Sequence, residues 1–292
     1  MHKPVLLKEV IFYLDPKPNE NFVDATFGLG GHSFEILKYI LPDGKILALE
    51  WDPYLVEIYK KSYMKHKNII LKNENFKNIK KVVREEKFTN IKGVIFDLGI
   101  SMWHYKNSKR GFSFNENSFL DMRINPFDVK ITAFEVVNYF SKEKLENILK
   151  TYGEEKYASK IAEEIVKRRK IKKIETAKEL SELIVRVVPR RKKIHPATKT
   201  FMALRSYINN ELENLEIGLE DAYEILKKGG RIVVITFQGL EDKVVKKVFK
   251  KLKSKGAKIL TKKVVRPSES EKLENPSARS AKLRAILKNE QE

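Results

Sequence analysis

The chain has 292 residues, of which 42% are hydrophobic, so it can bury the core of one large domain or of two smaller ones. It contains no cysteine, which excludes disulfides, thiolate metal sites, iron–sulfur clusters and thiol nucleophiles. The formal net charge of +20 favours a polyanionic partner, although a lysine-rich solvated surface gives the same excess.

The N-terminal segment, MHKPVLLKEV, enters an amphipathic pattern within a few residues. It has no long apolar core followed by small residues, so we expect no signal peptide, and no apolar run approaches the length of a membrane span. The sequence therefore predicts a globular, cytoplasmic protein that does not associate with membranes.

Short apolar runs alternate with amphipathic stretches in the first part of the chain. Strands are expected at residues 22–27, 45–50, 68–71 and 93–97, and helices at 33–39, 53–64 and 79–85. This alternation is typical of βαβ units, which form a parallel sheet covered on both faces.

The pattern changes between residues 106 and 206, where strand signals are weak and amphipathic helices are expected at 141–151, 155–169 and 176–188. After a helix at 209–226, strands are expected at 231–237, 259–265 and 281–287, with a helix at 241–252. We therefore predict an α/β fold: a doubly wound, Rossmann-like domain (1–105 and 207–292) with an inserted helical domain (106–206).

A glycine-rich turn, DATFGLGGHS at residues 24–33, follows the first strand. Glycines let the backbone turn sharply and approach a ligand, and the next helix presents free amides. The turn lacks the third glycine of the G-x-G-x-x-G dinucleotide fingerprint. Asp24 would repel a pyrophosphate but can face a cationic aminoacyl-sulfonium group. The turn therefore favours S-adenosylmethionine over NAD, with a plain tight turn as the alternative.

Side chains after the next strands fit the same cofactor. Glu50 ends the second strand, where a carboxylate can accept hydrogen bonds from both ribose hydroxyls, with Asp52 nearby. Phe76 follows the third strand and could stack on adenine, and Asp97 ends the fourth strand at the same crevice. Alternatively, Asp52 caps a helix that starts at Pro53, and Phe76 is a core aromatic residue.

Eight patterns, beginning with the glycine-rich turn, occur in a fixed order and carry a family resemblance. They are DATFGLGGHS at 24–33, DLGIS at 97–101, RGFSF at 110–114, LDMR at 120–123, YGEE at 152–155, HPATKTF at 195–201, LED at 240–242 and NPSARSAKLR at 275–284. Together they resemble the bacterial ribosomal RNA small-subunit methyltransferase H family. The resemblance implies a class I methyltransferase domain with an inserted substrate-recognition domain, and methylation of N4 of a cytidine in the decoding region of 16S ribosomal RNA.

The resemblance also implies which residues bind the cofactor: Gly30, Gly31, His32, Glu50, Phe76, Asp97 and His104. The chain departs from the usual family pattern at several positions. Glu50 replaces an aspartate, Met102 and His104 replace a serine and a glutamine, and Gln238 replaces a histidine. In place of that histidine, Gln238 offers only a neutral amide.

The residue types limit the chemistry of methyl transfer. Methylation of cytosine C5 needs covalent activation, usually by a thiolate, which this chain cannot supply. An exocyclic amine or a ribose hydroxyl remains as the acceptor. Because the N4 lone pair is delocalised into the ring, catalysis should come from orientation and electrostatics. Asp97 is the expected group, either orienting the amine or binding the cofactor; a capping carboxylate is the alternative.

Further candidates lie in the inserted segment, and for each a structural role is the alternative. Asp121 and Arg123 are candidate catalytic residues, and His195 and Lys199 are candidate substrate contacts. Two basic runs are expected to contact phosphates, or else to form solvated faces. They are Lys167, Arg168, Arg169 and Lys170, and Arg190, Arg191, Lys192 and Lys193. The histidines show no paired ligand spacing, so no metal site is expected.

The expected partner is small-subunit ribosomal RNA within the small ribosomal subunit, and the oligomeric state stays open. One alternative is a methyltransferase of the same fold that acts on DNA or on another RNA position. The other is a non-catalytic RNA-binding module, which the charge alone would permit. The intact glycine-rich turn together with Glu50 argues against that module.

Overall fold

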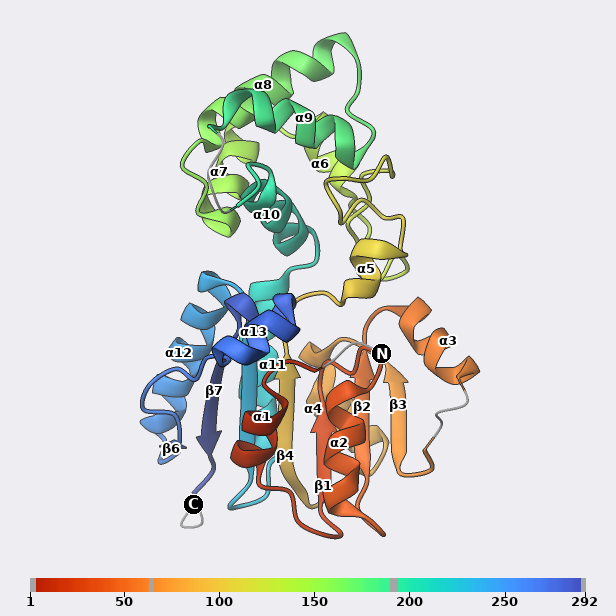
Figure 1. Cartoon of the computed structure of the whole chain (residues 1–292), viewed down its shortest axis with the longest axis vertical. Helices are drawn as coiled ribbons and strands as arrows, with labels where there is room; N and C mark the ends of the chain where they lie inside the picture. Colours follow the sequence, from red (N-terminus) through yellow and green to blue (C-terminus); the bar gives the residue numbers. More distant parts are fainter. Residues whose placement is uncertain (1–3, 63–65, 190–193, 290–292) are drawn as a thin grey trace. The chain divides into compact units, whose positions relative to one another are not determined.

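The computed structural model describes residues 4–62, 66–189 and 194–289, and the chain divides into two compact units (Figure 1). The first unit comprises Met1–Gly99 and Leu212–Glu292, and the second comprises Ile100–Glu211. The boundaries expected from the sequence, after residues 105 and 206, lie a few residues from these.

A seven-stranded sheet in the order β3-β2-β1-β4-β5-β7-β6 forms the centre of the first unit. The strands are β1 (Asn21–Asp24), β2 (Ile46–Glu50), β3 (Ile69–Asn73), β4 (Ile91–Asp97), β5 (Arg231–Thr236), β6 (Lys258–Ile259) and β7 (Lys282–Leu287). β1 to β5 are parallel, and β7 is antiparallel to both β5 and β6. The strand order reverses between β1 and β4, so the predicted doubly wound α/β fold is confirmed.

Helices cover both faces of this sheet (Figure 1). α4 (Ile79–Glu85), α11 (Glu211–Ile225) and α12 (Gly239–Lys253) pack on one face, and α1 (Leu7–Leu14), α2 (Gly31–Ile40) and α3 (Pro53–Lys61) supply the core of the other. In β5, Ile232 and Val234 point into the first core, while Val233 and Ile235 point into the second. This two-sided burial explains why the strands read as continuous apolar runs in the sequence.

The remaining elements of the first unit are short. η1 (Phe76–Asn78) precedes α4, and α13 (Glu269–Glu274) and η2 (Pro276–Ser280) lead into β7. The strand expected at residues 259–265 is wrong in extent, since β6 is Lys258–Ile259 and only an isolated bridge joins Val265 to Leu283. Pro267 is buried directly after this segment, and a proline cannot donate to a strand ladder.

The second unit is helical and has its own hydrophobic core. Its helices are α5 (Met102–Lys106), α6 (Ala133–Tyr139), α7 (Lys142–Gly153), α8 (Ala158–Ile171), α9 (Ala177–Val187) and α10 (Thr198–Ile208). Capping boxes start α6, at Thr132 and Glu135, and α9, at Thr176 and Glu179. None of the described helices, in either unit, combines the length and apolarity needed to cross a bilayer.

Candidate functional site

Three carboxyl groups mark one edge of the sheet in the first unit. Asp24, Glu50 and Asp97 are the last residues of β1, β2 and β4. Because these three strands are parallel neighbours, their carboxyl ends meet at the same edge, beside the point where the strand order reverses. The predicted cofactor residues of this unit therefore gather where a doubly wound sheet binds its ligands.

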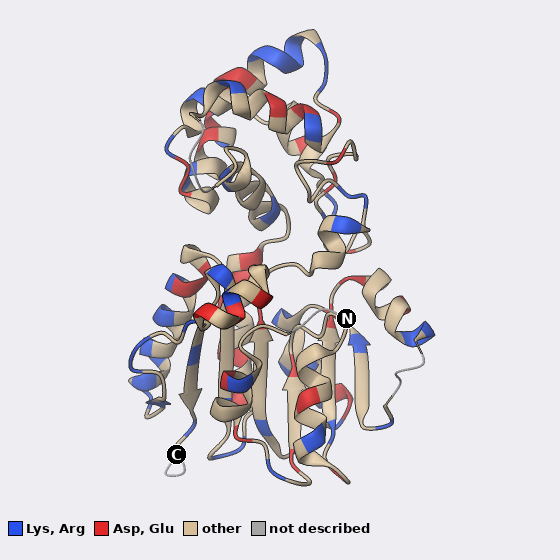
Figure 2. Ribbon diagram, viewed as in Figure 1, with Lys and Arg blue, Asp and Glu red and all other residues tan. Residues whose placement is uncertain are grey.

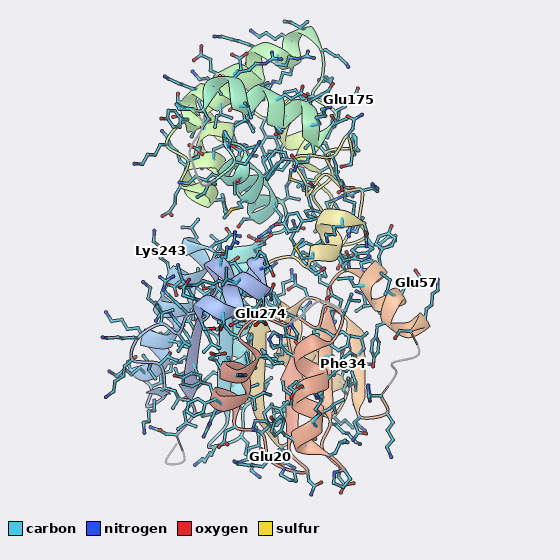
Figure 3. All side chains as sticks on the ribbon, in the orientation of Figure 1. Glu20, Phe34, Glu57, Glu175, Lys243 and Glu274 are labelled. Atoms are coloured by element: carbon cyan, nitrogen blue, oxygen red, sulfur yellow. The ribbon has the colours of Figure 1, made fainter. Side chains whose placement is uncertain are left out.

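The glycine-rich turn joins β1 to α2 and borders this edge. Gly30 is the N-cap of α2 with a φ of 84°, and a Cβ atom there would lie 2.7 Å from Cζ of Phe34 (labelled in Figure 3). Only glycine fits that position without strain. Gly28 has a φ of 57° and no atom within 4 Å of its missing Cβ. The turn thus leaves space beside Gly28 and presents α2 without a side-chain cap.

Asp24 is buried and organises the turn. Its Oδ1 accepts a hydrogen bond from the Thr26 amide at 3.1 Å, and its Oδ2 accepts one from Ser33 Oγ at 2.7 Å. Thr26 Oγ1 in turn accepts the Asp97 amide at 2.6 Å. Burial raises the pKa of Asp24. Asp24 therefore links β1, α2 and β4, and its direct contact with a cofactor stays a prediction.

Glu50 is held in place by backbone donors. Its Oε1 accepts from the Asp52 amide at 2.7 Å and its Oε2 from the Gly28 amide at 2.8 Å. Each oxygen keeps a second lone pair for another donor. Burial raises the pKa of the Glu50 carboxyl to about 8. The side chain is therefore preorganised at the position expected to receive the ribose hydroxyls.

Asp52, the second acid expected near the ribose, is the N-cap of α3. Its side chain accepts a hydrogen bond from the Tyr54 amide at 2.9 Å, Pro53 occupies the first turn, and the residue is 0% exposed. This geometry matches the capping interpretation of the sequence. A contact between Asp52 and the cofactor stays a prediction.

Asp97 faces His32, the third residue of the Gly30-Gly31-His32 motif. His32 Nε2 lies 2.9 Å from the Val5 carbonyl oxygen, and if it carries the proton, its Nδ1 has a lone pair directed toward Asp97 Oδ2, 3.6 Å away. Burial lowers the pKa of His32 and raises that of Asp97 to about 7. Although the Asp97 side chain is 28% exposed, its Oδ1 is buried and has no hydrogen-bond partner in the described structure.

The aromatic candidate Phe76 lies half-buried in η1. Its ring makes an edge contact with Phe96 at 5.6 Å, and it packs against Gly218 of α11. The preceding residue, Asn75, is buried; its Oδ1 accepts the Lys77 amide, and its Nδ2 has no partner within the described ranges. Asn75 is therefore a candidate adenine contact. It could not be predicted, because in the sequence it looks like any other loop asparagine.

The electrostatics of this edge fit a cationic ligand. Asp24, Glu50 and Asp97 form no ion pair with a lysine or arginine in the part of the chain that the structure describes. Repulsion from Asp24 adds to the raised pKa of Glu50. A positively charged group at this edge would relieve both the repulsion and the desolvation of the carboxylates. The residues therefore fit S-adenosylmethionine, whose sulfonium and ammonium groups are cationic.

The raised pKa values predict that cofactor affinity depends on pH. If Glu50 and Asp97 must ionise on binding, affinity should rise by about tenfold or more between pH 6 and pH 8 and level off above pH 8. Binding near pH 7 should release about one proton or more. Calorimetry in buffers of different ionisation enthalpy measures both quantities. A flat profile without proton release would contradict the prediction.

Asp121 and Arg123 form a two-pronged ion pair in the second unit. Arg123 Nε lies 2.6 Å from Asp121 Oδ1 and its Nη2 lies 2.8 Å from Oδ2. Arg123 Nη1 donates to the carbonyls of Pro126 and Val129, each at 3.2 Å. These contacts favour a structural role, in which the pair fixes the loop before α6, over the catalytic role expected from the sequence.

Replacing Arg123 with methionine tests that role. The change leaves the Asp121 carboxylate without its partner in a mostly buried setting, so the free energy of unfolding should fall by roughly 2–4 kcal/mol. Denaturant unfolding followed by circular dichroism measures this loss. Unchanged stability with a large loss of methyl transfer would instead support catalysis by Arg123.

The other candidates of the second unit have local partners. His104 is buried, with Nδ1 3.1 Å from Ser101 Oγ, and makes edge contacts with Trp103 and Phe112. His195 stacks on Phe114 with ring centroids 4.3 Å apart. Lys199 Nζ donates to the Glu154 carbonyl at 2.7 Å. Their predicted binding roles stay predictions.

The structure describes the first of the two basic runs but not the second. In α8, Lys167 pairs with Glu163 at 2.7 Å and Arg169 donates to the Val137 carbonyl at 2.8 Å. Arg168 Nη1 donates to the Lys172 carbonyl at 3.2 Å. The run Arg190, Arg191, Lys192 and Lys193 lies outside the described residues. Among the described residues, no group of three or more histidine and acidic side chains could hold a metal ion.

Comparisons with known proteins identify the family to which the chain belongs. The model of the MraW methylase family matches residues 1–289. A protein of Sulfurihydrogenibium sp. named ribosomal RNA small subunit methyltransferase H is 48% identical over 288 residues, covering 97% of both chains. A protein of the same name from Caldicellulosiruptor saccharolyticus is 44% identical, covering 98% of this chain and 99% of that protein. The crystal structure of an rRNA methylase from Streptococcus thermophilus aligns over 99% of both chains with 12% identity and a TM-score of 0.46.

Proposed function

Because this chain belongs to the MraW methylase family, we propose that it is an S-adenosylmethionine-dependent methyltransferase that acts on small-subunit ribosomal RNA. The group that we propose as acceptor is the N4 amine of a cytidine in the decoding region. With ribosomal subunits as its substrate, the enzyme would work in the cytoplasm. The observation that supports the chemistry best is the Asp97 carboxyl group, whose side chain is 28% exposed at the carboxyl edge of the sheet and whose Oδ1 has no hydrogen-bond partner in the described part of the chain.

Four side chains of the first unit would hold the cofactor. Glu50 would accept hydrogen bonds from the ribose hydroxyls, and Asn75 and Phe76 would contact the adenine. The carboxyl group of Asp97 would lie near the cationic end of the ligand. When bound, S-adenosylmethionine supplies a methyl group activated by the positive charge on sulfur.

Asp97 would also orient the acceptor. Its carboxylate, on a side chain that is 28% exposed, would accept a hydrogen bond from the N4 amine, which holds the nitrogen in line for attack. After methyl transfer the nitrogen carries an extra proton, and a carboxylate whose pKa lies near 7 can take it up. His32 Nδ1 lies 3.6 Å from Oδ2, too far for a hydrogen bond, so His32 would border the Asp97 carboxyl group without holding it.

The inserted unit would contribute to substrate binding through its basic runs. If Arg190, Arg191, Lys192 and Lys193 contact phosphates, replacing them with glutamine should flatten the plot of log affinity against log salt. Binding of small ribosomal subunits at several KCl concentrations measures the slope. An identical slope would show that these four charges face solvent.

The proposed substrate is tested by methyl transfer to different nucleic acids. Small ribosomal subunits purified without this modification, large subunits and duplex DNA are each incubated with the enzyme and cofactor labelled in its methyl group. We expect label in the small-subunit RNA only. Label in DNA or in large-subunit RNA, with none in the small subunit, would overturn the proposal. Cofactor binding without any transfer would favour a non-catalytic role.

A further inference from the structure

A long basic segment of the first unit has no part in the cofactor site. Between Lys243 and Arg266 the chain contains eleven lysines and arginines and no acidic residue. All eleven are exposed, and they occupy α12, β6 and the loop toward α13 (Figure 2). Lys243, labelled in Figure 3, lies near the start of this segment.

Acidic residues elsewhere in the fold neutralise only part of this charge. Lys247 pairs with Glu216 at 2.6 Å and Lys251 with Glu220 at 2.7 Å, both on α11. Lys246 lies 3.7 Å from Asp242 of its own helix. Five further cations of the segment form no ion pair within the described ranges, and they define a surface that we term the α12 basic face. It consists of Lys250, Lys253, Lys258, Lys262 and Lys263.

The placement of this face suits an extended polyanion. α12 begins at Gly239, three residues after the carboxyl end of β5, and its 15 residues extend for about 22 Å. Lys246, Lys250 and Lys253 follow one another at about one helical turn of 5.4 Å along its exposed side, close to the spacing of successive phosphates in an RNA strand. α12 therefore begins near the edge of the sheet that carries Asp97, and its charged row leads away from that edge.

A lipid surface does not fit this face. Val245, Val248, Phe249 and Leu252 of α12 are buried in the core of the first unit, and its other apolar residues, Leu240 and Val244, are partly buried. A helix that binds a membrane in its plane needs an exposed apolar face, which α12 lacks.

We propose that the α12 basic face binds the phosphate backbone of the substrate RNA at a distance from the reacting nucleotide. The inference rests on the proposed function for the identity of the polyanion. Contacts of this kind are independent of sequence and depend strongly on salt. The face should therefore contribute to substrate affinity and leave cofactor binding and the chemical step unchanged.

A charge-matched pair of variants tests this. The first replaces Lys250, Lys253, Lys258 and Lys262 with glutamine, which preserves helix propensity in α12. The control replaces Lys77, Lys81, Arg84 and Lys87, the exposed cations of η1, α4 and the residues after it. Both variants lose four positive charges. Acidic residues flank the control surface. Glu85 lies 3.9 Å from Lys81, and Glu224 of α11 pairs with Lys80, which precedes Lys81 in α4.

Binding of small ribosomal subunits is measured as a function of KCl for the parent and both variants. If all four lysines contact phosphates, the slope of log affinity against log salt should fall by roughly 3 in the first variant. Affinity at physiological salt should fall at least tenfold, while the control changes little and cofactor affinity stays the same in both. Equal effects in the two variants, or no change in slope, would overturn the inference.

The outcomes separate this inference from the proposed function. Suppose that the slope flattens in the first variant but the parent does not methylate small-subunit RNA. This result would support RNA binding by the α12 basic face and refute the proposed function. Normal methylation with unchanged slopes refutes the surface alone. If the first variant loses binding to polyaspartate but still binds RNA like the parent, the α12 basic face binds an acidic protein instead, and the inference is overturned.

Discussion

Replacing Asp97 with asparagine should lower the single-turnover rate of methyl transfer by on the order of a hundredfold at saturating cofactor. The change preserves the shape of the side chain but removes its charge, and the amide must present either a donor or a weaker acceptor to the N4 amine. The side chain would then no longer offer a strong acceptor at this position. Rapid mixing of enzyme–cofactor complex with small subunits, followed by quenching, measures the rate.

Cofactor affinity distinguishes the two roles of Asp97. If the carboxylate chiefly orients the amine, affinity measured by calorimetry should change much less than the rate. If it chiefly binds the cofactor, affinity should fall and saturating cofactor should restore most of the rate. If the folded variant has a normal rate of methyl transfer and a normal cofactor affinity, Asp97 has neither role and is only the last residue of β4.

Replacing Glu50 with alanine should weaken cofactor binding at least tenfold. The ribose hydroxyls would lose a charged acceptor, and the Gly28 and Asp52 amides would lose their partner. Because the second loss also loosens the glycine-rich turn, the melting temperature without cofactor should be recorded alongside the calorimetry. Unchanged affinity in a folded variant would refute the assignment.

Asp52 offers a matched control for Glu50. Asparagine is as good an N-cap as aspartate, so Asp52→Asn should preserve the hydrogen bond to the Tyr54 amide and the start of α3. If Asp52 only caps the helix, cofactor affinity should stay within about twofold of the parent. A loss as large as that of Glu50→Ala would place Asp52 in the ribose contact as well.

The fold was largely predictable because its main signals are local. The apolar runs of β1 to β5 and the amphipathic helices between them follow from burial on both faces of the sheet. β6 was the exception: its length is set by pairing with β7 at the sheet edge, a long-range contact that apolar character does not reveal.

The site was predictable only in part. Asp24, Glu50 and Asp97 could be placed together because parallel strands end at one edge, but their hydrogen-bond partners could not. The bond between Thr26 and the Asp97 amide joins residues 71 positions apart, and no local pattern encodes it. Asp121 and Arg123 show the same limit. The motif indicates that both residues matter, but only their contacts in the structure distinguish a structural ion pair from a pair of catalytic residues.

The most direct test of the account is the identity of the methylated nucleoside. Small ribosomal subunits lacking the modification are incubated with the enzyme and methyl-labelled S-adenosylmethionine, and the RNA is digested to nucleosides and analysed by mass spectrometry. We expect the label in cytidine that carries the methyl group on N4, and we expect Asp97→Asn to abolish most of it. Label in 5-methylcytidine or in a ribose-methylated nucleoside would contradict the account.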